Sequence, residues 1–383
     1  MEEESKRLIR EDVMKTMLKG GRVWNRDRSF IENCPIVIEN GLIRSVGVEE
    51  ECDEVLDVSG LTVLPGLVDA HSHGRAGGDF STATVAMMKS MKQDYLRSGV
   101  TSVFATLASG TAEEWHTAIA NIQEVGFDGI HLEGCYLNAA KRGAHPTHLL
   151  LPLQADLLEP FLKEIKLPCH VTAAYELDTD GSFAACVRSH GATMGLGHTT
   201  ATAAEAALAM ERGVRSFSHL YNAMPPLHHR EGGAVCTALT TDAWVEVIAD
   251  GLHICPEMVA LAWRCKSRDR FVLITDSMEA TGCPDGDYAI AGQPVIVKNG
   301  RAETLDGALA GSTLSLWDGV KNLMRFASVP LEEAVACATI NPAEMLGIDG
   351  SVGSIEVGKR ADLLLVNRDL ERCAVFSRGE RVL

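Results

Sequence analysis

The feature that most constrains the fold of this sequence is a strand–helix–strand segment, residues 195–226, in which both strands end at a histidine. The strand GATMGLGH ends at His198, and the strand VRSFSHL ends at His219. Between them, Thr202 precedes Glu205 by three residues, the spacing of a capping box that begins a helix. A β-α-β crossover keeps its strands parallel, so both imidazoles should lie at the same carboxyl-end edge of a sheet. This placement indicates a pair of metal ligands; the alternative is that one histidine only satisfies a local hydrogen bond.

The same alternation of strands and helices continues along most of the chain. It extends over residues 63–347 and is typical of a parallel (β/α)8 barrel. Residues 1–62 and 348–383 contain short strands joined by turns, including an Asn-Gly hairpin signal between two apolar runs. We therefore predict an α/β fold, a (β/α)8 barrel over 63–347 with a small β-sandwich domain built from both termini. A further hairpin-like stretch, residues 288–305, is expected to lie against the small domain.

Two other predicted strands end in groups that bind metals. The first barrel strand, LPGLVDAHSHG, carries His71 and His73, and side chains at positions i and i+2 of a strand point to the same face. The alternative for this pair is a hydrogen-bonded loop. The third strand, FDGIHLEG, ends at Glu133, whose carboxylate is costly to bury without a cation partner. The alternative for Glu133 is an exposed carboxylate on the rim of the barrel.

The remaining strands supply one candidate catalytic group and two side chains of lesser weight. The fourth strand contains His170, which we interpret as structural, and no lysine that would bridge two metals, so Glu133 should take that role. The seventh strand, WVEVIADGLHI, delivers His253 to the rim, and the eighth, RFVLITDSM, ends at Asp276. An aspartate facing metal ligands at this place is expected to act as the acid/base; its alternative role is a helix N-cap.

These strand-end residues form one candidate site of nitrogen and oxygen donors: His71, His73, Glu133, His198, His219 and Asp276. Such donors suit Zn²⁺ or Fe²⁺ better than a soft copper site, and we expect one or two divalent ions per subunit. A catalytic site keeps a position open for water, and the cation lowers the pKa of that water to about 7. With Asp276 accepting and returning the proton, the predicted reaction is metal-assisted hydrolysis of a C–N bond.

Composition excludes several classes of function. The net charge of −17 and the pI of about 5.2 argue against nucleic acid or an anionic membrane as a partner. Residues 1–13 lack the apolar core of a signal peptide, and no run approaches the ~18 apolar residues of a membrane span. The chain has 11 cysteines and no C-x-x-C pair. We therefore expect a reduced, cytoplasmic protein.

Several motifs along the predicted barrel resemble the N-acetylglucosamine-6-phosphate deacetylases of the amidohydrolase superfamily: GIHLEGCYLN, LGHTTATAAEA, FSHLYNAMPPLHHREGG, VIADGLH, LITDS and DGALAGST. The resemblance runs from residue 65 to about residue 347, and SHLYNAMPP with the downstream Arg-Glu-Gly is its most specific part. It implies removal of the acetyl group from N-acetylglucosamine 6-phosphate, in a homodimer, to give acetate and glucosamine 6-phosphate.

The resemblance also implies roles for individual residues. Glu133, His198 and His219 match metal ligands present throughout the family, and Asp276 matches the catalytic acid/base. Arg230 matches a phosphate contact supplied across the dimer interface. The other residues implied to bind substrate are His145, which steadies the substrate carbonyl as a second catalytic residue, Asn222 and Ala223, which cradle the sugar phosphate, His253, which contacts a sugar hydroxyl, and Cys135, in the loop after Glu133.

Two departures from the family pattern are visible. Cys135 stands where the family often has proline, and residues 174–176 replace a turn that often contains proline, which bears on the sugar-specificity surface. N-acetylgalactosamine 6-phosphate or another acylated amine therefore remains an alternative substrate. A non-enzymatic binding scaffold is the second alternative, although no expected ligand is missing. A nucleobase deaminase is disfavoured, because the YNAMPP segment suits a phosphorylated sugar as substrate. His228 and His229 are either substrate contacts or surface histidines.

Overall fold

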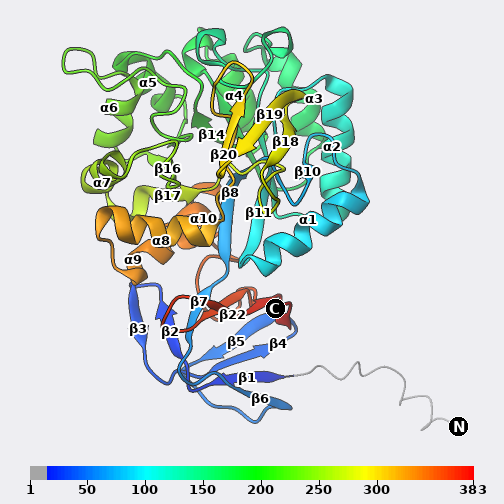
Figure 1. The fold of residues 1–383 in the computed structure, drawn as a ribbon, viewed down its shortest axis with the longest axis vertical. Helices are drawn as coiled ribbons and strands as arrows, with labels where there is room; N and C mark the ends of the chain where they lie inside the picture. The colour runs from blue at the N-terminus through cyan, green and yellow to red at the C-terminus, as the bar shows by residue number, and fades with distance from the viewer. Residues whose placement is uncertain (1–14) are drawn as a thin grey trace, which may run out of the picture. The chain divides into compact units, whose positions relative to one another are not determined.

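A computed structural model describes residues 15–383 (Figure 1). The expectation that residues 1–13 are not a signal peptide lies outside the described residues. The chain divides into two compact units. One joins the residues before Leu67 to Gly350–Leu383, and the other is Leu67–Asp349. No helix within residues 15–383 combines the length and the apolar character needed to cross a membrane.

The larger unit is a nearly closed barrel of eight parallel strands whose hydrogen-bonded order follows the chain. The strands are β8 (Leu67–Ser72), β11 (Val100–Leu107), β12 (Gly129–Glu133), β13 (Cys169–Ala173), β14 (Thr193–Leu196), β15 (Ser216–Phe217), β16 (Trp244–Ile248) and β17 (Phe271–Ile274). The ring closes just beyond the strand ends, where the Asp276 N–H donates to the His71 carbonyl at 2.9 Å. The predicted (β/α)8 barrel is confirmed, and its carboxyl-end edge gathers the polar residues that follow the strands.

Helices follow the strands around the barrel (Figure 1). They are α1 (Val85–Arg97), α2 (Ala112–Val125), α3 (Ala155–Glu164), α4 (Ser182–Ser189), α5 (Ala203–Glu211), α6 (Gly233–Thr240), α7 (Pro256–Cys265), α8 (Leu316–Ala327), α9 (Leu331–Ala336) and α10 (Ile340–Leu346). The predicted capping box at the start of α5 is present, because the Thr202 N–H donates to the Glu205 carboxylate at 2.8 Å and the Thr202 hydroxyl accepts from the Glu205 N–H. This cap fixes the point where the chain turns away from His198.

The hairpin-like stretch forms a three-stranded sheet, β18 (Gly286–Ile290), β19 (Gln293–Lys298) and β20 (Arg301–Thr304), within the larger unit. On its buried face, Ile290 and Val295 pack in one cluster with Met278, Ala280 and Ala310 of the same unit. The expectation that this stretch lies against the small domain was therefore wrong. Alternating burial in a strand predicts a half-covered sheet, but it carries no information about which surface covers it.

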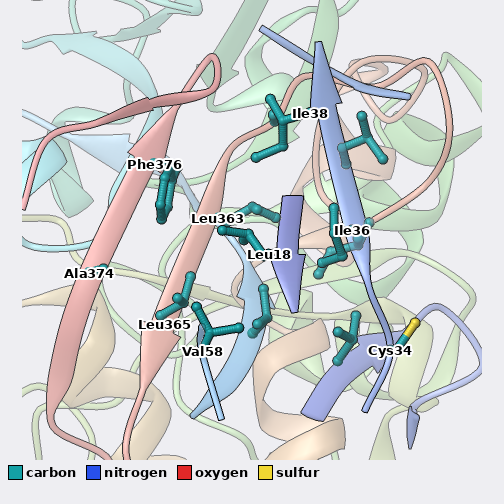
Figure 2. Close-up of a cluster of buried hydrophobic side chains, with 14 residues drawn as sticks. Leu18, Cys34, Ile36, Ile38, Val58, Leu363, Leu365, Ala374 and Phe376 are labelled. Atoms are coloured by element: carbon teal, nitrogen blue, oxygen red, sulfur yellow. The ribbon is translucent and has the colours of Figure 1, made fainter. Parts of the chain in front are cut away.

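The smaller unit is the predicted β-sandwich. One sheet has the order β5-β4-β1-β6 and the other β23-β22-β21-β7-β2-β3. The strands are β1 (Thr16–Lys19), β2 (Arg22–Asn25), β3 (Ser29–Ile31), β4 (Ile36–Glu39), β5 (Leu42–Val46), β6 (Glu54–Asp57), β7 (Thr62–Pro65), β21 (Leu363–Val366), β22 (Arg372–Ser377) and β23 (Glu380–Arg381). Figure 2 shows its core, where Leu18 and Ile36 of the first sheet meet Leu363 and Phe376 of the second. Each such buried side chain contributes about 1.5–3 kcal/mol, which joins the two ends of the chain into one unit.

A tight contact inside the barrel gives a test of its packing. Gly129 of β12 pairs with Phe104 of β11, and a Cβ added at Gly129 would lie 2.4 Å from the Phe104 ring. Phe104 is fully buried, and three atoms of its ring would lie within 2.6 Å of the added Cβ. Gly129→Ala should therefore destabilise the protein by about 1–3 kcal/mol, the usual cost of overpacking a core. Gly350→Ala, at a position with open space around the added methyl, should melt at the wild-type temperature in the same thermal scan. Equal melting temperatures for the two variants would contradict this packing.

Candidate metal centre and substrate cavity

The loops that leave the barrel strands hold several site residues in an unusual backbone conformation. His198 follows β14 after one residue, His219 follows β15, and Asp276 follows β17. Their φ values are 46°, 29° and 49°. Residues other than glycine seldom adopt positive φ, and each such residue costs on the order of 1–3 kcal/mol. Conformations of this kind cluster at functional sites, where the surrounding structure imposes them. Here they accompany the side chains that gather at the carboxyl-end edge of the barrel.

Glu133 lies at the centre of this group, and each of its two oxygens faces a different pair of histidines. Oε2 is 2.9 Å from the Nε2 atoms of both His71 and His73. Oε1 is 2.9 Å from Nε2 of His219 and 3.4 Å from Nε2 of His198. The Glu133 side chain is buried, so these imidazoles are its polar surroundings.

The candidate ligands therefore form two groups that share Glu133. The first group is His71, His73, Glu133 and Asp276, and the second is Glu133, His198 and His219. Within each group the ligand atoms all lie within 4.8 Å of one another. The structure thus brings together all of the residues that the sequence proposed as metal ligands. His170 belongs to neither group.

The second group fits a divalent cation on chemical grounds. The Nε2 atoms of His198 and His219 face each other at 3.0 Å. The Nδ1–H of His198 donates to the Lys141 carbonyl at 2.8 Å, so in the neutral ring Nε2 presents its lone pair toward His219. Nε2 of His219 also lies 2.9 Å from Oε1 of Glu133, so a cation bound at this point would be shared by both imidazoles and the carboxylate. A partner that holds Nδ1 in this way is typical of metal-ligating histidines.

The charges of the first group also favour a cation. Burial raises the pKa of Asp276, but the neighbouring imidazoles of His71 and His73 outweigh it and lower the pKa to about 2. Burial lowers the pKa of His73, but hydrogen bonds to Asp276 and Glu133 outweigh it and raise the pKa to about 9. Two buried carboxylates therefore stabilise positive charge at this point, whether a proton or a metal ion carries it.

His145 is held nearby in the opposite state. Burial, with a smaller effect of His198, lowers the pKa of His145 to about 3, so the ring is neutral at neutral pH. Its Nδ1 accepts from the Ser109 N–H at 3.3 Å and lies 2.9 Å from the Ser109 hydroxyl. The ring proton must then be on Nε2, which makes His145 a hydrogen-bond donor. The Cys135 N–H donates to the same Ser109 hydroxyl at 2.8 Å and helps to hold this arrangement.

A cavity of about 340 Å³ opens over the two ligand groups. This volume is in the range of small-molecule sites. Among the sequence-predicted residues, the cavity is lined by His73, Glu133, His145, His198, His219, Asn222, Ala223, His253 and Asp276. The Nδ1–H of His253 donates to Asp250 at 2.7 Å, which orients its ring. All of the predicted ligands except His71, and most of the predicted substrate contacts, therefore line one cavity.

The cavity also has walls that sequence reasoning missed. Lys141 lines it, with its ammonium group donating to the Met224 carbonyl at 3.0 Å. A positive charge four residues before His145 was a signal for this position. Ile290 and residues 308–311 form an apolar wall. Residues 308–311 lie in the motif DGALAGST, but that motif had no assigned role, and the place of Ile290 depends on where the β18–β20 sheet packs.

Two of the predicted substrate contacts do not line the cavity of this chain. Arg230 lies on an exposed loop, where its N–H faces Nδ1 of His228 at 3.4 Å. His228 and His229 on the same loop are also exposed, and their rings are in contact. The Cys135 side chain is buried, with Sγ 3.5 Å from the Gly110 carbonyl oxygen. Within one chain, Cys135 is linked to His145 through its N–H, which donates to the Ser109 hydroxyl.

Comparison with known proteins finds one matching family model and several similar proteins. Residues 62–382 match the model of the amidohydrolase family. The chain is 34% identical to N-acetylglucosamine-6-phosphate deacetylase of Vibrio furnissii, over 94% of this chain and 92% of that protein. It is 32% identical to N-acetylgalactosamine-6-phosphate deacetylase of Escherichia coli O157:H7, over 92% of this chain and 96% of that protein. A mutant N-acetyl-D-glucosamine-6-phosphate deacetylase from Mycobacterium smegmatis, solved in complex with N-acetyl-D-glucosamine-6-phosphate, superposes with a TM-score of 0.90, at 28% identity over 97% of this chain and 100% of that chain.

Proposed function

The chain belongs to the amidohydrolase family, and from this premise we propose that it hydrolyses the acetamide of N-acetylglucosamine 6-phosphate, releasing acetate and glucosamine 6-phosphate. The observation that carries the proposal is the placement of Glu133 between two histidine pairs on the floor of a substrate-sized cavity. His145 and Asp276 line the same cavity, so the groups that this hydrolysis requires face one space.

The metal is a divalent ion, Zn²⁺ or Fe²⁺, with one or two ions per subunit. Glu133, His198 and His219 would hold one ion, and His71, His73, Glu133 and Asp276 would hold the other. When bound, such an ion lowers the pKa of a coordinated water and polarises a carbonyl group. Nitrogen and carboxylate oxygen donors match the preferences of both metals.

The catalytic steps that we assign to this chain belong to two side chains. Asp276 accepts a proton from the attacking water and returns it to the departing amine nitrogen, as a general base and then a general acid. His145 donates its Nε2–H to the acetamide oxygen and stabilises the negative charge that develops there. Asn222 and Ala223 cradle the sugar phosphate, and His253 contacts a sugar hydroxyl. Lys141 adds a positive charge to the same cavity.

The second candidate substrate is N-acetylgalactosamine 6-phosphate, because a relative named for that activity is nearly as similar to this chain as those named for the glucosamine substrate. Acetate release from both epimers, measured as kcat/KM on the same metal-loaded preparation, separates the two. We expect the larger value for N-acetylglucosamine 6-phosphate. A larger value for the galactosamine epimer would transfer the proposal to that substrate, and hydrolysis of neither would favour the binding scaffold.

We further propose that the protein is a cytoplasmic homodimer in which Arg230 reaches the phosphate in the partner's cavity. The exposed position of Arg230 outside its own cavity supports a contact across an interface. The cysteines within residues 15–383 form no disulfide, which supports a reducing compartment. A charge of −17 repels a phosphorylated substrate at long range, so a local cation is needed to recognise it.

Arg230→Ala should raise KM for the 6-phosphate sugar about ten- to a hundredfold, because a charge-assisted hydrogen bond contributes about 1.5–3 kcal/mol. The KM for the unphosphorylated sugar should change much less. Arg264→Ala, on the exposed surface of α7, is the matched control and should leave both constants unchanged. Equal effects of Arg230→Ala on the two sugars would show that Arg230 does not bind the phosphate.

A further inference from the structure

We propose that Glu246, on β16, is a positioning residue for His71: it holds the imidazole in the tautomer and orientation needed to bind the metal of the first ligand group. This inference rests on the proposed function, since it assumes that His71 binds a metal. It concerns a carboxylate that lies beneath the cavity and does not line it. No motif singled out Glu246 as a site residue.

The contact that carries the inference is direct. Oε2 of Glu246 is 3.1 Å from Nδ1 of His71, while Nε2 of the same ring is 2.9 Å from Glu133 and 3.5 Å from Asp276. The two nitrogens of His71 therefore face two different environments: Nδ1 faces Glu246 in the barrel interior, and Nε2 faces the ligand group. Both Glu246 and His71 are fully buried, so water does not compete for this hydrogen bond.

The chemistry of the two groups assigns the proton. An ionised carboxylate only accepts hydrogen bonds, so the hydrogen between the two groups belongs to Nδ1 of His71. Nε2 faces the Glu133 carboxylate at 2.9 Å, and a metal ion that replaced the proton between them would leave a neutral ring with its hydrogen on Nδ1 and its lone pair on Nε2. A carboxylate that is hydrogen-bonded to the other nitrogen of a ligating histidine raises the basicity of the ring toward the metal and fixes the ring's orientation. The Lys141 carbonyl does the same for His198, so each ligand group has one histidine fixed from behind.

The other polar neighbour of Glu246 is His170, which lies farther away than His71. Nε2 of His170 lies 3.6 Å from Oε1 of Glu246, beyond hydrogen-bond distance, and Oε1 has no hydrogen-bond partner within residues 15–383. Nδ1 of His170 already bonds to the Thr193 hydroxyl at 2.8 Å. A buried carboxylate is costly unless it is hydrogen-bonded. Of the two imidazoles near Glu246, His71 is the closer one and lies within hydrogen-bond distance.

The test is a double-mutant cycle read by metal affinity, without any measurement of turnover. Zn²⁺ binding to the full chain is titrated against a chromophoric chelator for wild type, Glu246→Leu, His71→Ala and the double variant. Loss of the hydrogen-bond partner of a metal ligand usually lowers metal affinity 10–100-fold. We expect Glu246→Leu to show that loss, and to show it in the same Zn²⁺-binding step that His71→Ala weakens. The double variant should bind no more weakly than His71→Ala alone, because Glu246 acts through His71.

Two further variants separate positioning from folding. Val247→Ala removes packing from the same strand without touching His71, so it should lower the melting temperature and leave Zn²⁺ affinity unchanged. Glu246→Gln keeps the volume and a neutral acceptor, so it should fold and lose affinity severalfold, less than Glu246→Leu. Wild-type affinity in Glu246→Gln or Glu246→Leu, or additive losses in the double variant, would overturn the inference. Failure of the wild type itself to bind Zn²⁺ would instead overturn the proposed function.

Discussion

Asp276→Asn is expected to lower turnover by about a hundredfold or more, because general acid–base catalysis contributes about 10²–10⁴-fold and an amide does not take up the proton. Asparagine has nearly the shape of aspartate, so the backbone at this position should be retained. Asp276 is the one carboxylate that both lines the cavity and follows the last barrel strand, with Oδ1 3.3 Å from Nε2 of His73. The measurement is the kcat of acetate release at saturating substrate.

Because Asp276 also belongs to a ligand group, the same preparation must be assayed for bound metal. The proton-transfer role predicts that the loss of turnover persists when the variant carries the wild-type amount of metal. Asp287→Asn, on the exposed surface of β18, serves as the matched control and should keep full activity. Near-normal turnover of metal-loaded Asp276→Asn would remove the acid/base assignment.

Glu133→Gln is expected to have the largest effect on metal binding, because Glu133 supplies one oxygen to each ligand group. Both groups should lose affinity, by more than the 10–100-fold that loss of an outer hydrogen-bond partner costs. Elemental analysis after dialysis should find little metal, and acetate release should fall with it. Circular dichroism should show the barrel intact, since the substitution preserves the volume of the side chain.

The matched comparison is the double variant His71→Ala/His73→Ala, which removes ligands from the first group only. It should lower the metal content without abolishing it, since Glu133, His198 and His219 remain. If Glu133→Gln keeps the wild-type metal content, Glu133 does not join the two groups. If the histidine double variant loses all metal, then His71 and His73 form the principal site.

The parts of this structure that the sequence predicted are those that depend on local order along the chain. His198 and His219 each follow a strand of a β-α-β unit, and parallel strands bring their carboxyl ends to one edge. The capping box of Thr202 and Glu205 marked the start of the helix between them. Local rules of this kind were sufficient to predict the barrel and to predict that the candidate ligands lie at one edge of it.

The parts that escaped prediction depend on contacts between distant segments. Glu246 and His71 are separated by 175 positions in the chain and meet only because the barrel closes around its interior. The strand WVEVI contains one acidic residue in an apolar run, and nothing in that pattern indicates which histidine the acid would face. The apolar wall at Ile290 likewise required the position of the β18–β20 sheet, which alternation alone does not determine.

The positive φ values of His198 and His219 were also not predictable, because non-glycine residues rarely adopt them. One visible consequence is the length of β15, which the sequence pattern extended to His219 but which covers only Ser216–Phe217. The chain leaves the regular strand early so that the imidazole of His219 turns toward Glu133, where Nε2 lies 2.9 Å from Oε1. Tertiary contacts at the site outweighed the local strand preference.

We propose that a metal bound at Glu133 enables hydrolysis of the acetamide of N-acetylglucosamine 6-phosphate. The most direct measurement compares acetate and glucosamine 6-phosphate release by wild-type protein stripped with a chelator and by the same protein after Zn²⁺ or Fe²⁺ is restored. We predict that the stripped protein is inactive and that restored protein forms the two products in equal amounts. Undiminished release by the stripped protein, or no release from this substrate after either metal is restored, would contradict the claim.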